Sequence, residues 1–258
     1  MLPLRKHRIS RLEEFSDAVF GFALTLLVIT SAVPRNFDQL MVLLQGIPAF
    51  ACCFALLVWI WHEHDTFFER YPLQDGVTTL LNSALLFTVL LYIYPLKFMF
   101  DSFMFQVFGL RSDDQLTRMT LDELARASVL YGLGFFVLTG LFALLYLHAY
   151  RRREALGMSS LDAFDTRAKA GHQVVSMSVG LFAMLFALLG PRELAFLSPS
   201  SFALMGPGHW IYGKRMEKER LALIAREATA ARKVPASDAS VTSGSSESVK
   251  SVKSVQSA

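Results

Sequence analysis

Long runs of hydrophobic residues, separated by short polar stretches, dominate the chain. Six of these runs are close to the roughly 20 residues that an α-helix needs to cross a bilayer. Because lipid offers no hydrogen-bond partners to an open backbone, each run predicts a helix. The predicted spans are Phe15–Val33, Leu40–Trp61, Val77–Leu96, Ser128–Tyr150, Val174–Leu189 and Leu194–Tyr212. The pattern predicts an all-α, polytopic membrane protein with six transmembrane helices.

Proline and glycine interrupt some of these runs. Pro48 lies inside the second run, and Gly190-Pro191 ends the fifth. The sixth run has the weakest helical pattern, because it contains four such residues: Pro199, Gly206, Pro207 and Gly208. After the third run, the aromatic-rich segment 98–110 either extends that helix or lies along the outer surface as an amphipathic piece.

The loop charges predict an orientation, because Lys and Arg are enriched on the cytoplasmic side of membrane proteins. One side of the six-span arrangement carries Arg5, Lys6, Arg8, Arg11, Arg70, Arg151, Arg152, Arg153, Arg167, Lys169, Lys214, Arg215, Lys218 and Arg220. The other side carries Arg35, Lys97, Arg111, Arg118, Arg126 and Arg192. The richer side is expected to be cytoplasmic, so both termini face the cytoplasm, which agrees with an even number of spans.

The spans also set the domain organisation. Residues 1–213 are predicted to form a six-helix membrane domain, and residues 214–233 a charged cytoplasmic helix. Residues 234–258 are rich in Ser, Val and Lys and lack aromatic residues, so we expect a disordered tail. We do not expect the basic segment 5–8 to begin a cleaved signal peptide, because the apolar stretch after it is too long.

Composition narrows the class of protein further. Hydrophobic residues make up 53% of the chain and charged residues 18%, below the quarter that is typical of soluble domains. This leaves no room for a large soluble domain and makes the lipid bilayer the expected partner, with no nucleic acid. Cys52 and Cys53 are adjacent within an apolar run, so we expect free thiols rather than a disulfide or a metal site.

The start of the first run carries ionisable residues that need partners near a membrane. Arg11 and Asp17 are six residues apart, about 600° of helical rotation, so they point to different sides and do not pair simply. Asp17 therefore needs a donor from another segment. The candidates at the same depth are His62 and His64, beside Trp59 and Trp61 at the end of the second run, and Asn82 early in the third.

Another side of the first run is apolar. Phe15, Phe22 and Ile29 recur every seven residues, which places them about 20° apart around a helix. This stripe is flanked by Ala18, Thr25 and Leu26. One interpretation is a seam that packs against another helix or faces lipid. The other is a pore wall, in which apolar side chains form constrictions and Thr25 supplies one polar ring.

The segment His62-Glu63-His64-Asp65 contains residue types that bind metals. Histidines two residues apart diverge on a helix, so interfacial hydrogen bonding is favoured over a metal site, with proton sensing as a further alternative. A membrane-embedded metal carrier or enzyme would have to use this cluster. The chain contains neither HExxH nor a nucleophile motif, so we expect no enzyme activity, no metal and no cofactor.

The residues quoted above resemble a known family. Arg11-x-x-x-Phe15-Ser16-Asp17, followed by Ala18-Val19-Phe20 and Thr25-Leu26-Leu27, is similar to the signature of the potassium channel called transmembrane protein 175 and its bacterial relatives. Trp59-x-x-His62-Glu63-His64 is similar to the end of the second helix of that family. Asn82 leading to Pro95 is similar to its third helix, and the likeness is specific over residues 9–96.

The resemblance implies a potassium-selective channel subunit with six helices, cytoplasmic termini and K⁺ as the permeant ion. Four copies would surround a pore in a bacterial plasma membrane. It implies that Arg11, Phe15, Ser16 and Asp17 form a structural motif, supported by a polar network of Trp59, His62, His64 and Asn82. It also implies a pore lined by Phe22, Thr25, Leu26 and Ile29. A proton or non-selective cation pathway through the same pore is the alternative.

Overall fold

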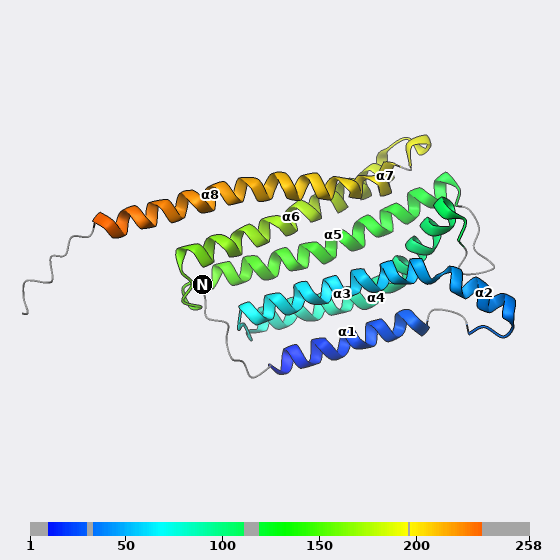
Figure 1. The fold of residues 1–258 in the computed structure, drawn as a ribbon, viewed down its shortest axis with the longest axis horizontal. Helices are drawn as coiled ribbons and strands as arrows, with labels where there is room; N and C mark the ends of the chain where they lie inside the picture. Colours follow the sequence, from blue (N-terminus) through cyan, green and yellow to red (C-terminus); the bar gives the residue numbers. More distant parts are fainter. Residues whose placement is uncertain (1–9, 30–32, 111–118, 196, 234–258) are drawn as a thin grey trace, which may run out of the picture. The chain divides into compact units, whose positions relative to one another are not determined.

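The computed structural model describes residues 10–29, 33–110, 119–195 and 197–233 (Figure 1). These residues form helices joined by turns and contain no strand. The chain divides into two units, Met1–Met216 and Glu217–Ala258. The first unit contains the helical bundle, and the described part of the second is the end of the last helix. The predicted tail, residues 234–258, lies outside the described residues.

The helices follow one another along the chain with short connections. They are α1 (Arg11–Ile29), α2 (Phe37–Gln45), α3 (Ile47–Arg70), α4 (Gly76–Phe108), α5 (Leu121–Arg151), α6 (Ser160–Leu189), the 3₁₀ turn η1 (Arg192–Leu194), α7 (Leu197–Ser200), the 3₁₀ turn η2 (Ser201–Leu204) and α8 (Met205–Lys233). Side-chain caps explain several starts. Asn36 and Asp75 cap α2 and α4, and Thr120 and Ser159 form capping boxes at α5 and α6.

The bundle of the first unit is built from sequential helix pairs. α1 packs against both α3 and α4, α4 packs against α5, and α5 packs along α6 over most of its length (Figure 1). The α5–α6 contact is close because glycines meet there. A Cβ atom at Gly132 would lie 2.8 Å from the carbonyl oxygen of Gly180 and 2.8 Å from the backbone nitrogen of Met184. The two backbones therefore touch at this crossing.

Four helices in the described residues are long and apolar enough to cross a membrane: α3, α4, α5 and α6. The prediction of an all-helical chain with several membrane-length helices is thereby confirmed. α1 falls outside this group because Arg11, Glu13, Glu14 and Asp17 lie in its first two turns. α8 also falls outside it, since charged residues fill most of its length after Gly213.

The second and third predicted spans have different bounds in the structure. The predicted helix Leu40–Trp61 is wrong as one piece: α2 ends at Gln45, and α3 begins at Ile47 with Pro48 in its first turn. Proline is tolerated there because the first backbone N–H groups of a helix have no intrahelical partner. Residues 98–108 extend the third helix, and α4 ends where Gly109 adopts a φ of 71°.

The sixth predicted span, Leu194–Tyr212, is also wrong as a continuous helix. Residues 192–204 form η1, α7 and η2, and the next long helix, α8, begins only at Met205. Pro199 lacks a backbone N–H and fixes its own φ, which favours short turns over one long helix. α8 then continues through residues 213 and 214 without a break, so the predicted domain boundary at that point is not a helix boundary.

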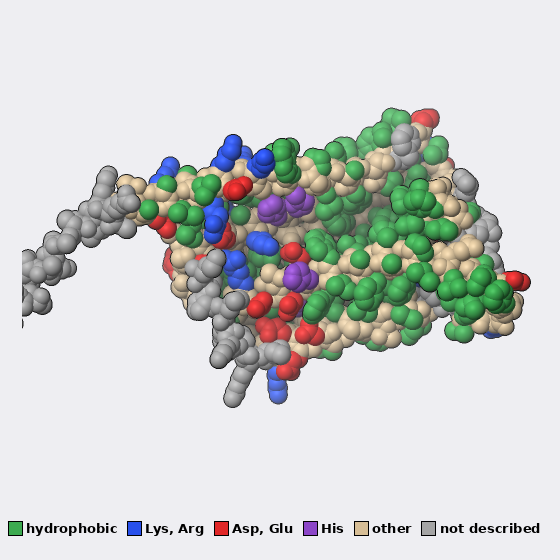
Figure 2. Space-filling model, viewed as in Figure 1, with side chains coloured by type: hydrophobic (Ala, Val, Ile, Leu, Met, Phe, Trp, Pro, Cys, Tyr) green, Lys and Arg blue, Asp and Glu red, His purple; other side chains and the backbone are tan. Residues whose placement is uncertain are grey.

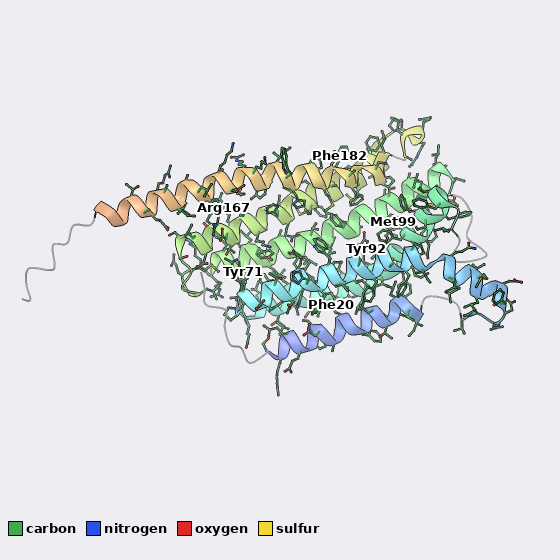
Figure 3. The ribbon with its side chains drawn as sticks, viewed as in Figure 1. Phe20, Tyr71, Tyr92, Met99, Arg167 and Phe182 are labelled. Carbon is green, nitrogen blue, oxygen red and sulfur yellow. The ribbon has the colours of Figure 1, made fainter. Side chains whose placement is uncertain are left out.

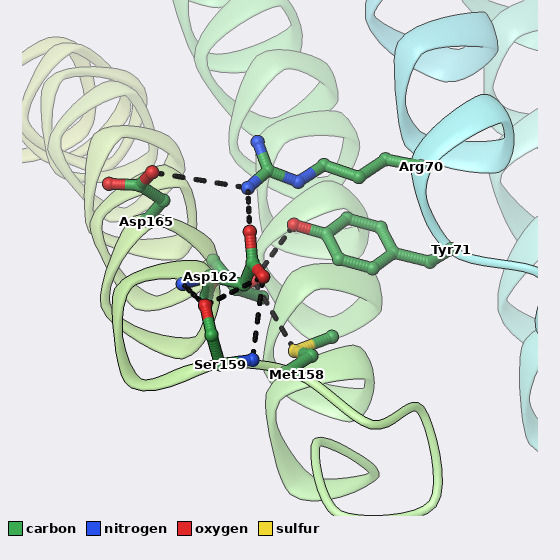
Figure 4. Close-up of polar contacts among 7 residues, drawn as sticks. Arg70, Tyr71, Met158, Ser159, Asp162 and Asp165 are labelled. Atoms are coloured by element: carbon green, nitrogen blue, oxygen red, sulfur yellow. Dashed lines mark hydrogen bonds and ion pairs between the residues drawn. The ribbon is translucent and has the colours of Figure 1, made fainter. Parts of the chain in front are cut away.

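Charged residues gather at one end of the bundle, where α1 begins (Figure 2). Arg70, the last residue of α3, lies 3.5 Å from Asp162 and 4.0 Å from Asp165 on α6, and the Tyr71 hydroxyl lies 2.9 Å from that of Thr166 (Figure 4). Here α3 is therefore tied to the start of α6.

A second junction at this end joins α4 to α5. Asp75 contacts His148 at 2.8 Å and Arg152 at 3.2 Å, both from the end of α5. Burial raises the pKa of Asp75, but hydrogen bonds from Thr78 and His148 outweigh burial and leave that pKa below its ordinary value. Asp75 is thus ionised at neutral pH, both as the cap of α4 and as the counter-ion of α5.

Candidate functional site on the first helix

α1 has two contrasting faces. Ser16, Phe20, Ala23 and Leu27 are at most 3% exposed and recur at the spacing of one helical face. Phe20 points toward α3 and α4, where its ring centroid lies 5.4 Å from that of His64 (Figure 3). This face fastens α1 to the bundle.

A chain of hydrogen bonds crosses the buried face and joins three helices. His64 Nε2 on α3 donates to Asn82 Oδ1 on α4 over 2.7 Å, and Asn82 Nδ2 donates to Ser16 Oγ on α1 over 2.9 Å. Ser16 Oγ in turn donates to the Leu12 carbonyl over 2.7 Å. Ser16 and Asn82 are 0% exposed and His64 is 2% exposed. Every member of this buried polar network therefore has a partner, as a buried polar group requires.

The donor to Asp17 is Trp61, which the sequence interpretation did not single out for this role. Trp61 Nε1 donates to Asp17 Oδ1 over 2.9 Å. Trp61 and His64 are three residues apart on α3, so one helical face presents both side chains to α1. That spacing was the available signal. Of the predicted donors, His62 is exposed and outside the network, and His64 is bonded to Asn82 instead.

Other residues assigned to the network lie elsewhere. Trp59 is 41% exposed and His62 is exposed, so neither joins the buried polar network. Arg11 is exposed as well and makes no ion pair within the described residues. Phe15 is 58% exposed and lies outside the buried face, about 100° around α1 from Ser16. The motif Arg11, Phe15, Ser16 and Asp17 thus divides between the two faces.

From Phe15 onward, the second face of α1 is open and apolar apart from Thr25. Phe22 is 55% and Ile29 68% exposed, and Thr25 between them is also exposed. The Thr25 hydroxyl donates to the Gly21 carbonyl of its own helix over 3.0 Å, which leaves its oxygen able to accept a further bond. Leu26 is half-buried and packs against the core, at the edge of this face. The predicted stripe is therefore a surface that the single chain leaves uncovered.

The segment 62–65 does not converge on one point. His64 is buried and bonded to Asn82, whereas His62 and Asp65 are exposed. Within the described residues, no three His, Cys, Asp or Glu side chains are grouped so that they could hold a metal ion. Cys52 and Cys53 are both free thiols.

Comparison with known proteins places this helix in context. The family model of the endosomal/lysosomal potassium channel TMEM175 matches residues 11–92, which comprise α1, α2, α3 and the first half of α4. A protein of Marivirga tractuosa named "Potassium channel" is 36% identical over 224 residues, covering 83% of this chain and 90% of that protein.

A solved structure is also similar. It is a crystal structure of a variant of the potassium channel MtTMEM175 in complex with a nanobody–MBP fusion protein. The likeness has a TM-score of 0.74 and 34% sequence identity, and covers 84% of this chain and 99% of that chain. The match to the family model begins at Arg11, the first residue of α1. The resemblance indicated by the sequence is confirmed. The chain belongs to the TMEM175 family of potassium channels.

Proposed function

We propose that the chain is one subunit of a potassium-selective channel in the cell membrane, and that the exposed face of α1 lines the pore. The observation that carries this proposal is the division of α1 into a buried face, held by polar bonds, and an open apolar face with one hydroxyl. Membership of a potassium channel family supports K⁺ as the permeant ion. Conduction in such a channel is passive, because K⁺ moves down its own electrochemical gradient.

The pore forms between subunits. The helices against which α1 packs extensively are α3 and α4. One chain therefore supplies one wall of a pore. Cyclic symmetry closes a channel from several such walls. We infer a homotetramer of six-span subunits with both termini in the cytoplasm. In this arrangement α1, the four apolar helices, and the stretch from α7 through the uncharged start of α8 are the spans, and the charged end of the bundle faces the cytoplasm.

The constriction works by excluding water. Apolar rings of Phe22 and Ile29 make a narrow passage costly for a hydrated ion, and the barrier depends on ring size and polarity. Phe22 is larger than an aliphatic residue at the same place, and Gly21 beside it leaves open space around the backbone. Thr25 is the polar group on this face that an ion shedding water would meet.

Potassium and sodium flux from liposomes containing the purified protein tests the proposal. Replacing Phe22 with Ala should lower the dewetting barrier. A decrease of about 1.4 kcal/mol in that barrier would raise basal flux about tenfold. Replacing Thr25 with Val should instead reduce the preference for potassium over sodium. Phe87→Ala and Thr79→Val are matched controls, because both are exposed positions on α4.

The outcomes separate the alternatives. If neither α1 variant changes flux or selectivity relative to its control, α1 does not line the pore. Equal potassium and sodium flux in the unmodified protein would favour a non-selective cation pathway. Acidification of the liposome lumen without potassium movement would favour a proton pathway.

A further inference from the structure

A second open feature lies away from α1, between α5 and α6. It is a groove of about 630 Å³, within the range of small-molecule binding sites, and Tyr212 of α8 closes one side of it. Most of its wall is apolar, with Val137, Leu144 and Leu147 from α5 and Val174 and Met177 from α6. The two helices that form it are among the four of membrane length, and its apolar lining suits the hydrocarbon core of a bilayer.

One end of the groove carries a cation. Arg167, in the second turn of α6, lines the groove and is exposed (Figure 3). Among the described residues it makes no ion pair, and no carboxylate lines the groove. Arg151 lies one helical turn beyond Leu147 on the same face of α5 and also makes no ion pair with a described residue. Two cations without counter-ions therefore lie at or near the same end.

The dimensions fit one hydrocarbon chain. The groove follows α5 from Val137 to Leu147, which at 1.5 Å per residue is about 16 Å. This is close to half of the roughly 30 Å hydrocarbon thickness, the depth of a single leaflet. The cationic end coincides with the charged end of the bundle, which the proposed topology assigns to the cytoplasm, where anionic lipids concentrate.

We propose that this groove binds an anionic phospholipid, with one acyl chain against Leu144 and Val174 and the headgroup phosphate at Arg167 and Arg151. The leaflet assignment rests on the proposed function, but the site itself does not. An apolar slot alone would take any lipid tail. The unpaired arginines at its mouth give the preference for a negative headgroup, because a guanidinium binds phosphate through paired N–H donors.

Lipid retention by the purified protein, measured by native mass spectrometry, tests this. Phosphatidylglycerol and phosphatidylcholine with identical acyl chains are added in equal amounts, and inorganic phosphate in a separate sample. We expect retained phosphatidylglycerol to exceed phosphatidylcholine, and no bound inorganic phosphate. Arg167→Gln should lower the phosphatidylglycerol preference about fivefold. Arg35→Gln removes an exposed cation that is far from Arg167 in the sequence, and it should leave the phosphatidylglycerol preference unchanged.

A second pair of variants tests the acyl slot. Val174→Phe fills the groove with another apolar side chain and should reduce retention of both lipids, whereas Leu130→Phe, at an exposed position of α5 outside the groove, should not. Equal lipid retention in Arg167→Gln and the unmodified protein would overturn the proposal. Loss of the oligomer in Val174→Phe would also overturn it, because the groove would then be a subunit interface. Because retention is measured without ion flux, failure here is distinguishable from failure of the channel assay.

Discussion

Single side chains decide how α1 is held. In the buried polar network each of His64, Asn82 and Ser16 is both buried and bonded, so removing one member leaves another polar atom without a partner. Such a loss costs more than the bond contributes, since the remaining group has already left water. Asn82 is the member whose side chain contacts both others, so we expect it to matter most.

Asn82→Leu should destabilise the folded subunit by about 2–4 kcal/mol, because it leaves the His64 imidazole and the Ser16 hydroxyl each short of a partner. The thermal midpoint of unfolding in detergent measures this. Ser83→Ala is the control, because the Ser83 hydroxyl is exposed and bonds only to a carbonyl of its own helix, that of Thr79. Equal midpoints for the two variants would contradict a stabilising role for the network.

The sequence predicted part of this arrangement. The seven-residue spacing of Phe15, Phe22 and Ile29 identified the open face of α1, because periodicity alone fixes which residues share a side of a helix. The partner of Asp17 was harder to identify. Choosing Trp61 over His62 requires the rotation of α3 about its axis relative to α1, which depends on packing across the whole bundle. What covers the open face, lipid or further copies of the chain, is set from outside the single chain, and no local pattern encodes it.

At the scale of elements, the contacts between helices differ in kind. The α5–α6 seam is made by backbone against backbone at Gly132 and Gly180, while α1 meets α3 and α4 through side chains. Hydropathy located the central part of α5 and α6 well. It missed the first half of α6, Ser160–Gln173, because that half is polar and is helical through its capping box and its ion pairs with Arg70. It joined residues 194–212 into one span because their apolar composition outweighed Pro199.

Gly132→Ala tests the α5–α6 seam. The added methyl would meet backbone atoms at Gly180 and Met184, which no rotamer change can move aside. The helices must separate, and we expect a loss of about 1–3 kcal/mol in the free energy of unfolding. Gly21→Ala is the matched control, since a Cβ there meets nothing within 4 Å and alanine favours the helix. If both variants unfold at the midpoint of the unmodified protein, the two backbones are not in contact.

At the scale of the whole molecule, the described residues leave an apolar face of α1 uncovered. Its most exposed apolar side chains on α1, Phe15, Phe22, Val28 and Ile29, are each at least 55% exposed. Contact with lipid would account for the exposure of these side chains, and so would a pore that they line together with neighbouring copies. Assembly distinguishes the two arrangements, because only the second needs a fixed number of subunits.

Mass measurement of the protein in nanodiscs should therefore give a tetramer, about four times the 28.9 kDa of one chain after subtraction of lipid and scaffold. The flux assay should be run on the same preparation. A stable monomer that still conducts potassium would contradict a pore built from several α1 helices. A tetramer that falls apart in Phe22→Ala but not in Phe87→Ala would instead assign the open face of α1 to subunit contact.

The backbone contact at Gly132 and Gly180 has a mechanical consequence. Where two backbones touch, the helices separate only by giving up close packing, so we expect α5 and α6 to move together as one rigid pair. α1 is attached differently, through side chains: apolar contacts of Phe20, Ala23 and Leu27 along its length, and hydrogen bonds near its start. Contacts between side chains can adjust by rotamer changes, whereas a contact between two backbones cannot. We therefore expect α1 to shift against α3 and α4 more easily than α5 shifts against α6.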